Sequence, residues 1–160
     1  MWFKYFTLIL LFCLIAILQS SIMIYFSILG FIPNIIFILF LVIIFFEEKN
    51  EYDLGFWSLV IAGFFMDILL PYFFGISLIT LLIIYILEKF ALHFLKEGSS
   101  RFTIFYFIPM FIGCFMIYNA ILYLISLIFN FNISFQINSL IISSIYNLIF
   151  ACIIFYTYKF

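Results

Sequence analysis

The chain has 160 residues, of which 70% are hydrophobic and 8% are charged, and its formal net charge is −1. So apolar a chain has too little polar surface to cover a water-exposed globule, which excludes a soluble domain and predicts an all-α integral membrane protein. Residues 1–160 fit one transmembrane helical domain, and no basic tract of the kind that binds nucleic acid is present.

Apolar runs close to the length of a membrane helix, about 20 residues, recur along the chain. In chain order they predict six transmembrane helices at residues 5–28, 32–46, 54–70, 74–92, 103–128 and 137–158. Lys4 precedes the first run, but no small-residue cleavage site follows it, so we expect a retained helix rather than a signal peptide. Gly30 and Pro33 mark the start of the second helix, and Pro71 separates the third helix from the fourth.

The positions of the basic residues predict how the chain crosses the membrane. Lys and Arg favour the cytoplasmic side, and the predicted connections 30–33, 71–74 and 130–136 contain neither. With six spans and a cytoplasmic N-terminus, all the basic residues lie on the cytoplasmic side, namely Lys4, Lys49, Lys89, Lys96, Arg101 and Lys159. We therefore predict that both termini are cytoplasmic.

Charged residues also gather in two predicted cytoplasmic connections, "EEKNEYD" and "HFLKEGSSR". The simpler interpretation of each is a solvated connection, and the alternative is a docking surface for a partner or for anionic lipid. Glu88 lies beside Lys89 near the predicted inner interface, so we expect its side chain to reach the surface as a snorkelling charge.

Asp67 stands inside the apolar stretch "GFFMDILLPYFFG". Counted from residue 54, it lies about 20 Å along its helix, roughly two thirds of the way across a hydrocarbon core of about 30 Å. An ionised carboxylate there costs about 3 kcal/mol unless it is compensated. No Lys or Arg is expected at this depth, so Asp67 needs neutral donors, backbone amides near residues 71–75, water or a proton. The same estimate places other polar side chains in this layer: Gln19, Thr80, Asn119, Ser143 and Ser144.

This polar layer has a structural and a functional interpretation. It is either a hydrogen-bonded clasp that fixes helix packing or a site for a small molecule or ion, and we favour the clasp because the layer has no second charge. If the clasp is neutral, Asp67→Asn should preserve the fold. A channel or proton-coupled transporter would use Asp67 as its ionisable site, but it too lacks a second charged group.

Small residues at helical spacing, Gly55, Ser58, Ala62 and Gly63, predict a thin face on the third helix where another helix can approach closely. Catalytic motifs such as H-E-x-x-H, G-x-S-x-G or a phosphate loop are missing from the sequence, and its cysteines lie in apolar runs without C-x-x-C spacing. We therefore predict a protein that is not an enzyme and that has no cofactor or metal.

The run "GFIPNIIFILFLVIIFF", followed by "GFWSLVIAGFFMDILLPYFFGISLITLLIIYILEKF", resembles the bacterial rod shape-determining protein MreD family. The resemblance covers most of the first 90 residues. It rests on a helix that begins after Pro and Asn, a G-x-x-x-D helix, a short break and a Gly-led helix. The matching positions are Pro33, Asn34, Gly63, Asp67, Pro71 and Gly75. The break "LLPYFFG" departs from the smaller break, with Gly or Ser, that is usual in the family.

The resemblance implies a non-enzymatic scaffold of the cell-elongation machinery for peptidoglycan synthesis, in the bacterial inner membrane. It implies an MreC-like protein, a RodA-like glycosyltransferase, a class B penicillin-binding transpeptidase and MreB filaments as partners, besides membrane lipid. The MreD family is similar in fold to the substrate-binding components of energy-coupling-factor transporters, so the alternative function is vitamin binding. Apart from the stretch 130–138, the predicted outer connections are very short and leave little chain for a lid over a ligand, which favours the scaffold.

Overall fold

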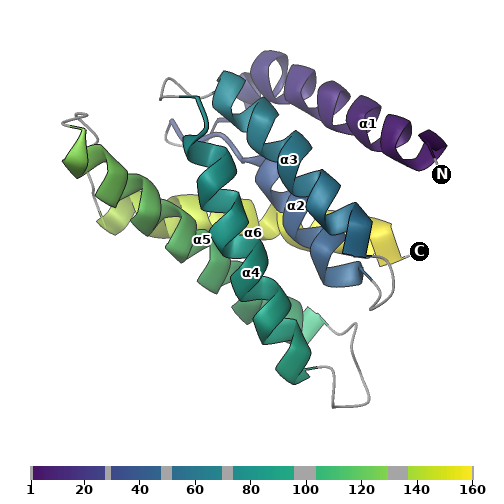
Figure 1. The fold of residues 1–160 in the computed structure, drawn as a ribbon. Helices are drawn as coiled ribbons and strands as arrows, with labels where there is room; N and C mark the ends of the chain where they lie inside the picture. The colour runs from purple at the N-terminus through teal and green to yellow at the C-terminus, as the bar shows by residue number, and fades with distance from the viewer. Residues whose placement is uncertain are drawn as a thin grey trace.

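The computed structural model describes residues 2–27, 30–47, 52–69, 74–95, 104–129 and 137–159. It is all-helical, with one α-helix in each predicted span and one short 3-10 helix (Figure 1). The elements are α1 (Trp2–Ser21), η1 (Met23–Phe26), α2 (Ile35–Phe46), α3 (Tyr52–Leu69), α4 (Ile76–Leu95), α5 (Ile104–Ile128) and α6 (Ile137–Lys159). The prediction of a single first helix over residues 5–28 is wrong at its end, because α1 stops at Ser21 and η1 follows.

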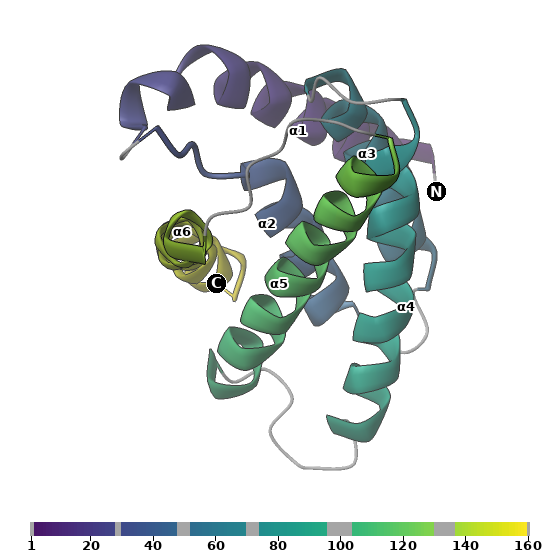
Figure 2. The ribbon, with the colours of Figure 1, turned by 90° about the vertical axis from the view of Figure 1, so that its left-hand side faces the viewer.

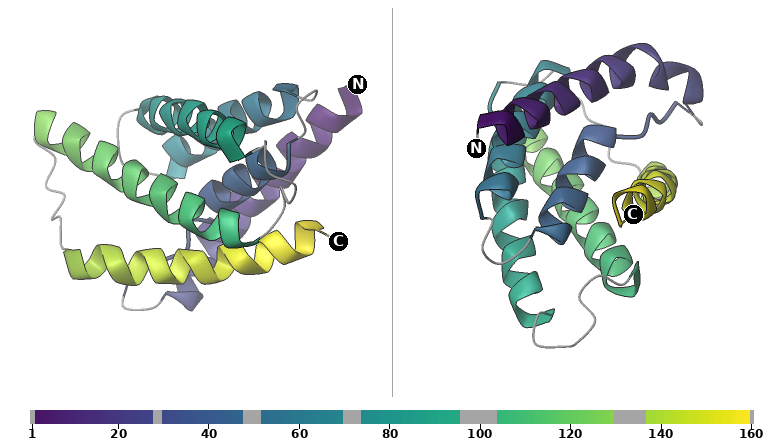
Figure 3. Two further views of the ribbon diagram at one scale, coloured as in Figure 1. Left: turned by 90° about the horizontal axis from the view of Figure 1, so that it is seen from below. Right: turned by 90° about the vertical axis from the view of Figure 1, so that its right-hand side faces the viewer.

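Consecutive α-helices run in alternating directions (Figure 1). The start of α1 and the end of α6 lie toward the same end of the bundle, which we call the termini end. The ends of α2 and α4 also lie there, whereas α2, α4 and α6 begin toward the opposite end, which we call the far end (Figures 1 and 3). The described helices therefore form an antiparallel bundle.

The core is built around α2, whose sequence "IIFILFLVIIFF" is apolar on every side. A helix that is apolar all round is either a core helix or a membrane span, and since ten of the 12 residues of α2 are buried, other helices rather than lipid cover it. It packs against α1, α3, α4 and α6 (Figure 2), and the rings of Phe37 and Phe45 contact Phe111 and Phe107 of α5. Its length of about 18 Å is well below the thickness of a hydrocarbon core, about 30 Å.

Four of the described helices contain stretches long and apolar enough to cross a membrane: Phe3–Ser21, Ile76–His93, Ile104–Ile128 and Asn138–Tyr158. Their outward-facing side chains are large and apolar, as Leu14, Ile86, Leu124 and Ile153 illustrate. Such a surface suits lipid rather than water as its solvent, which indicates a membrane-embedded protein. The shorter apolar helices are Ile35–Phe46 and Leu54–Leu69.

Gly63 lies where α3 and α4 approach closely. A Cβ atom at this position would lie 2.8 Å from the Cα atom of Leu78, which is backbone and cannot turn aside. We expect Gly63→Ala to force the two helices apart and to lower the free energy of unfolding by about 1–3 kcal/mol. Unfolding of the purified protein in detergent measures this loss. Gly113→Ala is the matched control, because nothing lies within 4 Å of a Cβ atom there; equal stability of the two variants would contradict close packing at Gly63.

Candidate functional site

Polar side chains from three parts of the chain meet at the start of α2. The first N–H groups of a helix have no partner within the helix, and inside an apolar region other groups must satisfy them. Asn34 is the N-cap residue, and its Oδ1 accepts a hydrogen bond from the N–H of Phe37 at 3.1 Å. Gln19 of α1 supplies a second acceptor, because its Oε1 receives the N–H of Ile36 at 3.3 Å.

Asn147 of α6 completes this arrangement. Its Oδ1 accepts the backbone N–H of Asn34 at 2.7 Å, and its Nδ2 donates to the carbonyl oxygen of Ser143 at 2.8 Å and to the Ser143 hydroxyl at 3.3 Å. The first turn of α2 is thereby held by side chains of α1 and α6 and by the N-cap residue of α2 itself. On the same helix, the hydroxyl of Tyr146 donates to the carbonyl oxygen of Phe26 in η1. Asn147 is not among the residues of the predicted polar layer, although an Asn within an apolar run indicates a buried polar side chain that needs partners.

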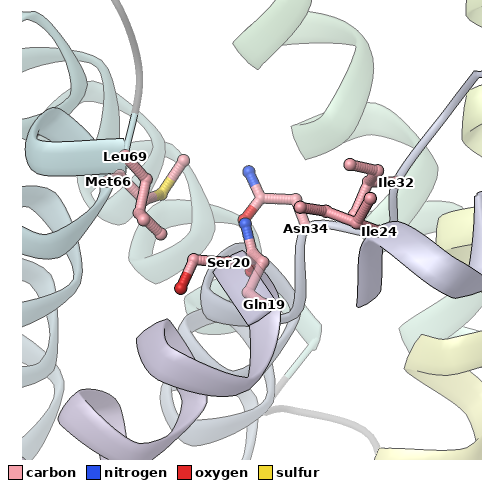
Figure 4. Close-up of a pocket in the computed structure, with 7 residues that line it drawn as sticks. All are labelled: Gln19, Ser20, Ile24, Ile32, Asn34, Met66 and Leu69. Atoms are coloured by element: carbon pink, nitrogen blue, oxygen red, sulfur yellow. The ribbon is translucent and has the colours of Figure 1, made fainter. Parts of the chain in front are cut away.

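A cavity of about 430 Å³ adjoins the start of α2 (Figure 4). Met66 and Leu69 of α3 form one side, and Ile24 and Ile32 form the opposite side. The amide groups of Gln19 and Asn34 lie between these apolar walls, near each other and toward the middle of the space. The lining consists of Gln19, Ser20, Ile24, Ile32, Asn34, Met66 and Leu69. Apolar walls with a few convergent polar groups are typical of small-molecule and lipid sites.

Asp67 binds the start of α4 and does not line this cavity. Its two carboxylate oxygens accept the backbone N–H groups of Gly75 at 2.7 Å and of Ser77 at 2.8 Å. Gly75 has a φ of 102°, a left-handed conformation that favours glycine, and its carbonyl oxygen accepts the N–H of Ile79 as the helix begins. Asp67 therefore acts as an N-cap supplied by the preceding helix, and its charge complements the positive end of the helix dipole.

The remaining residues of the predicted polar layer occupy separate positions. Thr80 donates to the carbonyl oxygen of Ile76 and Asn119 to that of Phe115, so both bond to their own helices. Ser144 is half-buried, and Ser143 is brought to Asn147. Pro71 lies outside the described residues, whereas Pro33 is buried just before α2. The layer thus divides into caps on helix starts and bonds within helices.

A charged pair lies near the end of α2. The side chain of Glu47 is 1% exposed, forms an ion pair with Lys89 of α4 and accepts the N–H of Gly55 in the first turn of α3 at 2.7 Å. A Cβ atom at Gly55 would lie 2.5 Å from Glu47 Oε2, so any larger residue there would require the Glu47 side chain to shift. For Glu47 the prediction of a solvated connection is wrong, because this carboxylate is used to cap α3. Residues 48–51 and 96–101 lie outside the described part.

Glu88 is buried, so the prediction of a snorkelling surface charge is also wrong. It belongs to a stripe of α4 with Leu81, Ile84 and Leu92, spaced three and four residues apart, that faces the core. Its side chain is 1% exposed, and neither carboxylate oxygen has a hydrogen-bond partner within the described ranges. Helical phase, rather than distance from the end of the helix, decides this burial.

The described residues contain no group of three or more His, Cys, Asp or Glu side chains that could hold a metal ion. The cysteines Cys13, Cys114 and Cys152 are free thiols. What the arrangement does chemically is to supply acceptors to helix starts and to leave amide donors facing a cavity.

Comparisons of the chain with models of protein families, with curated proteins and with solved structures found no match. The resemblance to the MreD family stays a prediction, and so do the partners that it implies.

Proposed function

We propose that this chain is a six-span, non-enzymatic membrane scaffold of the cell-elongation machinery. The observation that carries the proposal is the use of three of its buried polar side chains. Glu47, Asp67 and Asn147 all bind the starts of the chain's own helices, which makes them part of the fold. The surface left for function is then the apolar outer face of the bundle, which is suited to contact with other membrane helices.

Several features support six spans with both termini in the cytoplasm. The caps at the start of α2 and at Gly55 satisfy backbone groups that would otherwise be exposed to hydrocarbon at the ends of short helices. Lys4, Lys89 and Lys159 belong to helix segments toward the termini end, as the preference of basic residues for the cytoplasm requires. The compartment in this proposal is the bacterial inner membrane.

The proposed partners are an MreC-like protein, a RodA-like glycosyltransferase and a class B penicillin-binding transpeptidase, with MreB filaments on the cytoplasmic side. Helices that meet in lipid gain little from the hydrophobic effect, so they associate through shape and a few polar contacts. The outer faces of α1, α4, α5 and α6 offer apolar side chains at helical spacing, which suits such contacts.

Site-specific photo-crosslinking in cells tests the proposal. A crosslinking amino acid is placed at one outward position on each long helix, and at the buried Ile84 as control. We expect at least one outward position to capture the transpeptidase, the glycosyltransferase or the MreC-like protein, and Ile84 to capture none. Capture of none of these partners from any position would contradict the scaffold. The outward positions are Leu14, Ile86, Leu124 and Ile153.

The cavity favours one alternative, the substrate-binding component of an energy-coupling-factor-type vitamin transporter. Its volume of about 430 Å³ suits a small molecule, and it combines polar and apolar walls. Such a component works with a pair of ABC-type ATPases, so affinity purification of the full chain separates the two functions. Recovery of the ATPase pair with a stoichiometric vitamin would replace the scaffold, whereas recovery of the elongation proteins would exclude the transporter.

A further inference from the structure

We propose that the cavity at the start of α2 holds one amphipathic molecule by its acceptor oxygens, and that this molecule is a membrane lipid. The inference does not depend on the proposed scaffold function. It rests on the size of the cavity, on the chemistry of the amide groups that face it and on the surface onto which its rim opens.

The size and lining of the cavity suit an occupant with an apolar part. About 430 Å³ corresponds to more than ten water molecules at about 30 Å³ each. The walls formed by Ile24, Ile32, Met66 and Leu69 offer no hydrogen-bonding side chain to water. Ordered water needs two to four polar partners, which most of this space cannot provide. A hydrocarbon segment against these walls keeps them dry.

The polar side of the cavity offers donors. The oxygens of Gln19 and Asn34 are already occupied by the N–H groups of Ile36 and Phe37, so each side chain presents its NH2 group to the space. Within the described ranges, neither NH2 group has an acceptor. The positive end of the α2 dipole lies at the same place and disfavours a cation. The matching chemistry is an ester, carboxylate or phosphate oxygen.

The rim indicates where this molecule comes from. Ile24 is 53% exposed and Ile32 is 39% exposed, and neighbouring Tyr25 and Phe26 are more than half exposed as well. A rim of exposed apolar side chains next to the lipid-facing surface of α1 opens toward lipid rather than toward water. A glycerophospholipid combines acyl chains for the walls with ester and phosphate oxygens for the amide donors, so it meets each requirement.

Two nearly isosteric substitutions test the donors without removing the caps. Gln19→Glu and Asn34→Asp keep the oxygens that bind Ile36 and Phe37 and replace each NH2 group with an acceptor. The full chain is purified in a mild detergent, washed, and weighed by native mass spectrometry. We expect the wild type to retain one phospholipid, and each variant to retain it with about tenfold lower affinity, since a lost hydrogen bond to a charged group is worth at least 1.4 kcal/mol. Asn138→Asp, on the exposed start of α6, is the matched control and should retain it.

A filling substitution gives an independent measurement. Ser20→Leu places a larger side chain in the cavity and so reduces its free volume, while both caps on α2 stay in place. This variant should therefore also displace the molecule. Solvent extraction then identifies the source: a phospholipid supports the proposal, and a water-soluble carboxylate or phosphate compound overturns the choice of lipid. A wild-type protein without any retained molecule, or unchanged occupancy in all three cavity variants, overturns the site itself. Partner crosslinks that persist in these variants show that the cavity and the scaffold surface act separately.

Discussion

Replacing Glu47 with alanine should lower the free energy of unfolding by about 3 kcal/mol, because removing one member of a buried ion pair is strongly destabilising. The substitution takes away the carboxylate that pairs with Lys89, whose side chain is 16% exposed. It also removes the acceptor of the Gly55 N–H at the start of α3. The same side chain therefore joins α2, α3 and α4, and its loss should loosen all three at the termini end.

Unfolding of the purified protein in detergent, followed by circular dichroism, measures this effect. Glu47→Gln is the matched variant, because its neutral amide oxygen can still accept the Gly55 N–H, so we expect a smaller loss. A double-mutant cycle with Lys89→Met isolates the contribution of the ion pair, and the coupling should exceed 1 kcal/mol. Wild-type stability in Glu47→Ala would contradict the burial of this pair.

Asp67→Asn should lower the free energy of unfolding by about 2 kcal/mol. Each carboxylate oxygen of Asp67 accepts one backbone N–H, from Gly75 or from Ser77. An asparagine side chain has only one acceptor oxygen, so its NH2 group would face the other backbone N–H, and two donors cannot bond to each other. The favourable interaction between the carboxylate and the α4 dipole is lost as well. This outcome differs from that of a neutral clasp, for which the asparagine variant would preserve the fold.

The control for Asp67 is Ser77→Ala. It keeps the Ser77 N–H that donates to Asp67 and removes only a hydroxyl that is buried without a hydrogen-bond partner in the described ranges. We expect this variant to be at least as stable as the wild type. Amide hydrogen exchange adds a local test: in Asp67→Asn, protection of the Gly75 and Ser77 amides should fall before that of the remaining helix. Equal unfolding energies for Asp67→Asn and Ser77→Ala would contradict the capping role.

The positions of the helices could be predicted because the length of an apolar run is a local property. Hydropathy predicted a first helix to residue 28, but it counts apolar side chains and carries no information on backbone hydrogen bonding. In the structure α1 ends at Ser21, where the Ser20 hydroxyl bonds back to the carbonyl oxygen of Ile17 and η1 begins. The same limit applies to the number of membrane crossings, since only four of the helices in the described ranges contain stretches of full length.

The candidate site was only partly accessible from the sequence. The backbone amides around residue 75 were among the expected partners of Asp67, because an acid near a helix start has an obvious local acceptor role. Asn147 and Asn34 are 113 residues apart, and nothing in their local sequences specifies that they pair. Glu47 lies in a charged stretch that composition alone assigns to solvent, yet its position at the end of α2 places it inside the bundle.

The enclosure of α2 has a consequence for the order of events during synthesis. Twelve residues are too few to be stable across a lipid bilayer alone, and the backbone N–H of Asn34 finds its acceptor on α6, the last of these helices to leave the ribosome. Until then, we expect the start of α2 to stay near the headgroups or against the translocation machinery. We therefore expect the segment to enter the membrane only together with its neighbours, and a nascent chain halted before residue 137 should leave it accessible to water-soluble thiol reagents at an introduced cysteine.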